Sequence, residues 1–120
     1  MPPLPSARLL EVEQVSDITV VRLPWKELLD DETIEHVGGQ LYALVDHLGT
    51  RKLVLNLSSV KRMASLMLGK IMTLHKKLKP LQGKLVLCGI DPDIRRVFDI
   101  LRFPQLLSIC KDEQEALQSF

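Results

Sequence analysis

Apolar residues in this chain form two kinds of run: short blocks typical of strands and longer stretches at helical spacing. The blocks ARLLEVEQ and DITVVRL lie on either side of a short polar turn near Val15–Asp17 and predict an antiparallel hairpin. Three later blocks, KLVLNL, KLVLCG and QLLSIC, are also of strand type. Helical spacing marks residues 32–48, residues 65–79, the stretch after Asp91 and the stretch after Asp112. The segment PWKELLDD is expected to be a connection.

Residues that start and stop helices support these boundaries. Asp30 or Asp31 can cap the first helix by accepting a hydrogen bond from a free backbone N–H, and Gly49 suits its end. The second helix begins at Ser65, an N-cap type of residue, and ends at Pro80. The third helix follows an Asp-Pro pair, in which an N-cap precedes proline at the first helical position. Its expected apolar face consists of Ile94, Val97, Phe98 and Leu101.

The order of elements predicts an α/β domain, because strands that alternate with helices favour parallel pairing through crossovers. Strand blocks without strict alternation, such as LVL, indicate burial on both faces of the sheet. We therefore expect Leu55, Leu57, Leu87 and Phe98 in the core. Gly69 is expected to allow a close approach of the second helix to a neighbouring element, since glycine otherwise costs about 1 kcal/mol relative to alanine in a helix.

Composition narrows the class of protein further. The chain has 120 residues, 46% of them apolar, which is enough for one domain with a substantial core. No apolar run approaches the roughly 20 residues of a membrane span, and the N-terminus lacks a secretory pattern. We expect a soluble, cytoplasmic protein. Cys88 and Cys110 lie among apolar neighbours and are expected to be two buried, reduced thiols.

Charge is unevenly distributed along the chain. Residues 1–50 carry three basic and nine acidic side chains, whereas residues 51–102 carry twelve basic and three acidic ones. A basic middle can indicate an acidic protein partner or a nucleic acid. No aromatic residue that could stack on bases is interleaved with these lysines. The pattern therefore favours the solvated face of a helix, and no nucleic acid partner is expected.

Motifs of catalysis are missing from the sequence. VGGQL lies within a helix and lacks the spacing of a phosphate-binding loop. His36, His47 and His75 have no metal-binding spacing, and no nucleophile elbow or Cys–His pattern occurs. The carboxylates at Asp30–Glu32 stand at a helix start, where they serve capping. The protein is expected not to be an enzyme and to need neither metal nor cofactor.

Two motifs resemble the STAS domain family, specifically its anti-sigma factor antagonists. LVLNLSSV is similar to the family's strand of VLDLS type, and Ala64-Ser65-Leu66-Met67-Leu68-Gly69 occupies the place of the family's Asp-Ser-Ser/Thr/Ala-Gly-Leu-Gly motif. QGKLVLCGIDPDIRRVFDILRF is similar to the later GGxLxLxGxxPxVxxxFxxxGL pattern. The resemblance covers roughly residues 8–120 and implies a single domain with a small mixed sheet and about four helices, preceded by a tail over residues 1–7.

The resemblance also implies a regulatory function. Such a domain binds an anti-sigma factor of the serine-kinase type and so releases a sigma factor. Phosphorylation of the motif serine, here Ser65, breaks that complex, and a phosphoserine phosphatase is compatible with this cycle as a second partner. The implied contact surface comprises Asp30, Arg62, Met63, Ala64, Ser65, Leu66, Met67 and Asp91.

This sequence departs from the family pattern at several of these positions. Ala64 replaces the acid before the serine, Leu66 replaces a small residue, and Met67 replaces the first glycine. The family's Gly-x-Leu-Asp turn is reduced to Leu29-Asp30. Ser65 can therefore be a modifiable contact, a helix N-cap or both. The alternative functions are a scaffold or transport-complex STAS domain that binds its partner constitutively, and a nucleic-acid binder that uses the basic middle.

Overall fold

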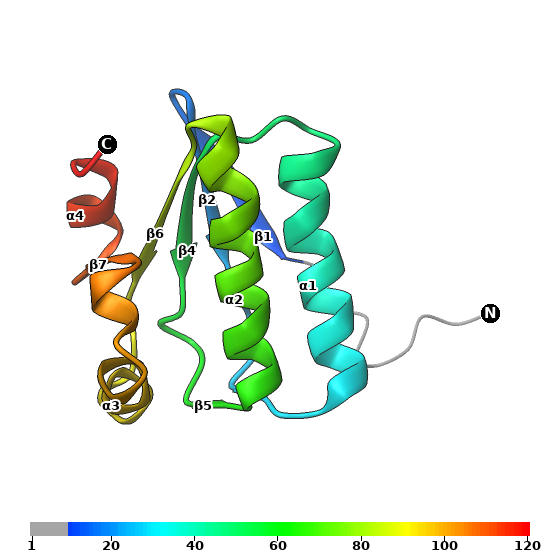
Figure 1. Ribbon diagram of the computed structural model, residues 1–120, viewed down its shortest axis with the longest axis vertical. Helices are drawn as coiled ribbons and strands as arrows, with labels where there is room; N and C mark the ends of the chain where they lie inside the picture. Colours follow the sequence, from blue (N-terminus) through cyan, green and yellow to red (C-terminus); the bar gives the residue numbers. More distant parts are fainter. Residues whose placement is uncertain (1–9) are drawn as a thin grey trace.

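Five strands form the central sheet of residues 10–120, the part of the chain that the computed structural model describes. Their order is β1-β2-β4-β6-β7 (Figure 1). The bounds are Glu11–Val15 for β1, Ile18–Arg22 for β2, Lys52–Asn56 for β4, Lys84–Cys88 for β6 and Ser108–Cys110 for β7. The β1–β2 hairpin is antiparallel and every other pair in this sheet is parallel. The predicted hairpin and parallel pairing are confirmed. The predicted tail, residues 1–7, lies outside the described residues.

The central strand β4 is buried on both of its faces. Leu53 and Leu55 point into the larger core, and Val54 points into a smaller core on the opposite face. This explains why KLVLNL lacks strict alternation of apolar and polar residues. Leu55, Leu57, Leu87 and Phe98 are all fully buried, as predicted.

Four α-helices cover the sheet, as predicted. They are α1 (Asp31–Asp46), α2 (Ser65–Leu78), α3 (Pro92–Ile100) and α4 (Glu113–Leu117), and short 3-10 helices follow α2 (η1, Lys79–Leu81) and α3 (η2, Phe103–Gln105). In Figure 1, α1 and α2 lie side by side over one face of the sheet. Ala116 and Leu117 of α4 pack on the smaller core instead. No helix in the described residues is long and apolar enough to cross a membrane.

Two short strands form a second sheet that the sequence did not predict. β3 (Glu27–Leu28) pairs in parallel with β5 (Arg62–Met63). The expectation that PWKELLDD is only a connection was therefore wrong. Two-residue strands leave too little periodicity to detect, and their pairing depends on segments that lie far apart in the sequence.

Two expectations about helix packing were also wrong. Val97 of α3 and Leu101, which follows the helix, are exposed, and only Ile94 and Phe98 of the expected apolar face are buried. Gly69 is exposed, and a side chain there would meet open space. Among the glycines of α1 and α2, the one with a close neighbour is Gly38 of α1, where an added Cβ would come within 2.9 Å of the Lys70 side chain of α2.

Truncation of Phe98 should destabilise the domain strongly. Its ring is fully buried and lies 5.1 Å from that of Phe103, centroid to centroid. Phe98→Ala should lower the free energy of unfolding by about 3–5 kcal/mol, because it removes a large buried side chain and leaves a cavity. Ile100→Ala on the same helix is the matched control, since Ile100 is 79% exposed. Urea denaturation of both variants measures the difference, and equal losses would contradict the packing of α3.

Candidate functional site

The start of α2 is held in place by a short, well-bonded loop after β4. The Val60 amide donates to the Leu57 carbonyl at 3.0 Å, and the buried Val60 side chain anchors this turn in the core. Beyond it, the Lys61 amide donates to the Lys26 carbonyl at 2.7 Å and the Ala64 amide to the Leu28 carbonyl at 2.8 Å. The backbone that leads into α2 is therefore fixed by β3.

Ser65 is the first residue of α2 and is exposed to solvent. The N-cap is Ala64, in an extended conformation, and no side chain caps this helix. The expectation that Ser65 itself is the N-cap was therefore wrong by one residue. The acid that the sequence lacks before the serine would stand at the capping position.

The N-terminus of α2 differs electrostatically from those of the other helices in residues 10–120. Aspartates cap the other three α-helices: Asp30 accepts from the Thr33 amide, Asp91 from the Asp93 amide and Asp112 from the Glu115 amide. Each of those helices also carries an acid in its first turn, whereas α2 has none. The partial positive charge at the start of α2 is therefore not compensated by a carboxylate of its own first turn.

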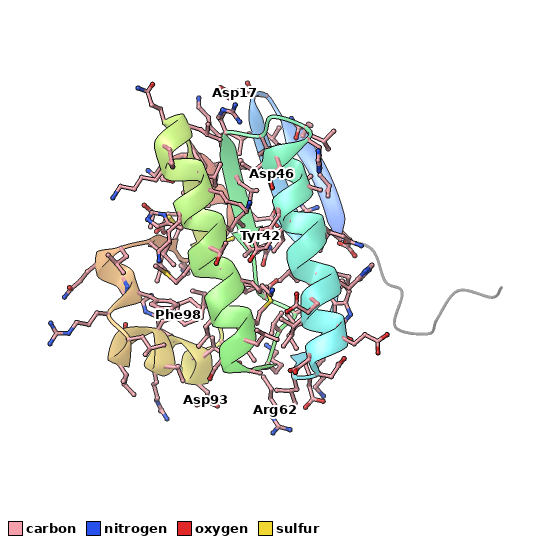
Figure 2. All side chains as sticks on the ribbon, turned by 45° about the vertical axis from the view of Figure 1, so that its right-hand side comes forward. Asp17, Tyr42, Asp46, Arg62, Asp93 and Phe98 are labelled. Carbon is pink, nitrogen blue, oxygen red and sulfur yellow. The ribbon has the colours of Figure 1, made fainter. Side chains whose placement is uncertain are left out.

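Charged side chains surround this helix end. Arg62 pairs with Glu27 at 3.1 Å across the β3–β5 sheet, and the ammonium of Lys61 lies 3.8 Å from the Asp91 carboxylate. Figure 2 shows Arg62 at the end of the molecule where α1 and α2 begin. Asp91 is the N-cap of α3, so its ion pair with Lys61 places the N-terminus of α3 beside the loop that leads into α2.

The structure brings together most of the residues that the sequence assigned to a contact surface. Arg62, Ser65 and Leu66 are exposed, whereas Met63 and Ala64 are partly buried. Asp30 lies two residues beyond β3, and the Thr33 amide that donates to it lowers the pKa of its carboxyl.

Met67 does not belong to this surface. Its side chain is fully buried in the larger core, so its assignment as a contact residue was wrong. Methionine stands where the family has glycine. Its side chain fills space beneath α2 and does not enlarge the exposed loop.

A polar cluster that the sequence did not reveal lies at the carboxyl ends of β2 and β4. The guanidinium of Arg22 donates two hydrogen bonds, of 2.6 and 2.7 Å, to the carboxylate of Glu113 in α4, and the side-chain Nδ2 of Asn56 donates to the same carboxylate at 2.5 Å. The oxygen of the Asn56 side chain accepts from the Ser58 amide at 2.8 Å. The cluster thus connects α4 to the loop between β4 and β5, which leads toward Ser65. Arg22 and Glu113 are 91 residues apart in the sequence, so no local sequence pattern predicts the pair.

The opposite end of the sheet carries a hollow of about 540 Å³ that is open to solvent. Its lining includes Asp17, Leu48 and Lys52. Within residues 10–120, no three His, Cys, Asp or Glu side chains are grouped so that they could hold a metal ion.

A four-helix α/β domain that presents a serine at the exposed start of a surface helix has the architecture of a STAS domain. The STAS domain family model matches residues 10–116, and the chain belongs to this family. BtrV of Bordetella bronchiseptica, whose name assigns it to the anti-sigma factor antagonists, is 30% identical over 93 residues, which cover 78% of this chain and 79% of BtrV.

Two further anti-sigma factor antagonists or related regulators are similar to this chain. The anti-sigma F factor antagonist of Paenibacillus polymyxa is 26% identical over 108 residues, which cover 90% of this chain and 91% of that protein. The Bacillus cell fate determinant SpoIIAA, solved in its phosphorylated form, has the same fold with a TM-score of 0.71 and 21% identity. That match covers 92% of this chain and 97% of the SpoIIAA chain.

An aspartate at position 64 should stabilise the domain. Ala64 has the extended backbone of an N-cap but no side-chain oxygen to accept from the first turn of α2. Ala64→Asp should therefore raise the free energy of unfolding by about 0.5–2 kcal/mol. The isosteric Ala64→Leu control supplies no acceptor and should give no such gain. Thermal and urea denaturation provide the measurement, and an unchanged or lower stability of Ala64→Asp would contradict the geometry of this cap.

The Arg22–Glu113 pair should make stability depend on pH in the acidic range. Hydrogen bonds from Arg22 lower the pKa of Glu113 below its ordinary value. Ionised Glu113 therefore stabilises the fold above the pKa of the unfolded chain, about 4.3, and this contribution is lost as the pH falls through the lower, folded-state pKa. Wild type should lose stability more steeply than Glu113→Gln on acidification below about pH 5. Parallel pH profiles for the two proteins would contradict the pairing.

Proposed function

We propose that this protein is an anti-sigma factor antagonist that binds an anti-sigma factor of the serine-kinase type through the start of α2 and thereby frees a sigma factor. Phosphorylation of Ser65 ends the complex, and a phosphoserine phosphatase restores it. The observation that carries the proposal is the exposed Ser65 at the first position of an uncapped helix, in a chain of the STAS family. The names of BtrV and of the Paenibacillus protein support the same function.

A phosphate on Ser65 suits the fold while it changes the surface. It adds about −1.5 to −2 charges at pH 7 and three strong acceptor oxygens. The start of a helix attracts negative charge, and α2 has no acidic residue in its first turn to repel it. Phosphorylation should therefore leave the domain folded and act on the interface through charge and size. The phosphorylated form of SpoIIAA, which has the same fold, supports this idea.

The exposure of residues around Ser65 supports contact with a folded protein. Leu66 is exposed beside the serine, and Gly69 lies one turn further along α2, where an added side chain would meet open space. A partner can therefore approach the helix backbone closely. The α3 helix lies at the same end of the molecule (Figure 1), and Val97, Ile100 and the C-cap residue Leu101 are exposed apolar side chains there. Such side chains are expected at the core of a protein interface.

The proposal is tested with the purified anti-sigma factors of the source organism and calorimetric measurement of binding. Ser65→Ala should bind like wild type, whereas Ser65→Glu should bind at least tenfold more weakly, a loss of about 1.4 kcal/mol or more. Ser65→Glu should keep or slightly raise the melting temperature, because an acid in the first turn favours the helix. Thr73→Glu is the matched control, since Thr73 is exposed on α2 but two turns away. It should bind like wild type.

Two results would contradict the proposal in different ways. If Ser65→Glu and Ser65→Ala bind equally well, the protein is a constitutive binder without a phosphorylation switch, an alternative favoured by the absence of the acid at Ala64. If no anti-sigma factor binds to folded wild type, the function itself is wrong. Incubation with a bound kinase and ATP, followed by mass spectrometry, shows whether Ser65 is the residue that is modified.

A further inference from the structure

Cys88 and Cys110 are direct neighbours on two parallel strands. Cys88 is the last residue of β6 and Cys110 the last of β7, and the two are paired in the register of the sheet. Both side chains pack on the smaller core, beneath α4, and both thiols are free. Cys88 is fully buried as the sequence predicted, but Cys110 is only partly buried.

The spacing of the two residues is compatible with a covalent bond. Neighbouring strands lie about 4.7–4.9 Å apart. Disulfides join residues whose Cα atoms are roughly 4.4–6.8 Å apart. β7 has three residues and, among the strands of residues 10–120, pairs with β6 alone, so few backbone hydrogen bonds hold it in the sheet.

The environments of the two sulfurs set the order of reaction. Burial raises the pKa of the Cys88 thiol to about 12, and the nearby Glu113 and Cys110 contribute to this rise. Cys88 is therefore protonated and shielded from solvent. Cys110 is the more accessible sulfur, so an oxidant from solvent meets Cys110 first.

We propose that Cys88 and Cys110 form a peroxide-sensitive dithiol whose oxidation to a disulfide fastens the edge strand β7 to β6. The Cys110 sulfur attacks one oxygen of hydrogen peroxide, which yields a sulfenic acid and water. The Cys88 sulfur then attacks the Cys110 sulfur, and the hydroxyl group leaves with the Cys88 proton as a second water. Each sulfur loses one electron, and the peroxide is reduced by two.

This disulfide would form next to a backbone hydrogen bond that holds the start of the loop between β4 and β5, which leads toward Ser65. The Cys88 carbonyl accepts from the Leu57 amide at 2.9 Å, at the start of that loop. Gly89 follows, and its amide donates to the Lys111 carbonyl at 3.2 Å. A disulfide would close a covalent loop over residues 89–109 and thereby restrain the unfolded chain. The oxidised domain should melt at a higher temperature than the reduced one.

The test is titration of the reduced, folded protein with hydrogen peroxide, followed by alkylation in denaturant and mass spectrometry. Wild type should lose both alkylatable thiols together, become two hydrogens lighter and yield a linked peptide pair containing Cys88 and Cys110. Dithiothreitol should restore both thiols and return the melting temperature to that of the reduced protein. In the Cys110→Ser control, Cys88 should remain fully alkylatable at the same peroxide concentration.

Several outcomes would overturn the proposal. These are retention of both thiols, accumulation of Cys110 as sulfinic acid with Cys88 still free, and disulfide-linked dimers through Cys110. A melting temperature that falls on formation of the internal disulfide would show that the bond strains β7. Circular dichroism of the reduced variants confirms that each is folded, so that a change in reactivity is not a consequence of unfolding.

Discussion

Burial of β4 on both faces is the constraint on which the rest of this structure depends. The strand is paired along both edges, with β2 and with β6, and its apolar side chains need cover on either side. One face is covered by α1 and α2 and the other by α4. Because β2, β4 and β6 run in the same direction, their carboxyl ends meet at one end of the molecule. The loops that carry the candidate site therefore share that end.

The site is held by backbone bonds more than by its own side chains. The β3–β5 pairing fixes the path into α2, and the carboxamide of Asn56 connects the preceding loop to Glu113. The phosphate that we propose on Ser65 would therefore be added at an exposed position on a well-anchored helix end. Within residues 10–120, the contacts that stabilise this end of the domain do not involve the Ser65 side chain. A switch by covalent modification needs such a separation.

The sequence predicted the main sheet, the four helices and the burial of Leu55, Leu57, Leu87 and Phe98, because periodicity and capping residues depend on burial over several turns or strand positions. It did not predict β3 and β5, which are too short to be periodic, or the cluster of Arg22 and Glu113, which depends on contacts distant in sequence. Gly69 was misinterpreted since a glycine can mark either close packing or open space. Met67 was assigned to the contact surface from its place in the family motif, although its helical spacing from Ile71, Leu74 and Leu78 indicates the buried face of α2.

The central claim is that a partner protein covers the start of α2. Amide hydrogen exchange of the domain, free and bound to its anti-sigma factor, tests this claim most directly. We expect slower exchange in residues 57–70 and in the first turn of α3, with β1 and the hollow lined by Asp17 and Lys52 unchanged. Protection confined to the hollow or to α4, with residues 57–70 unaffected, would contradict the account.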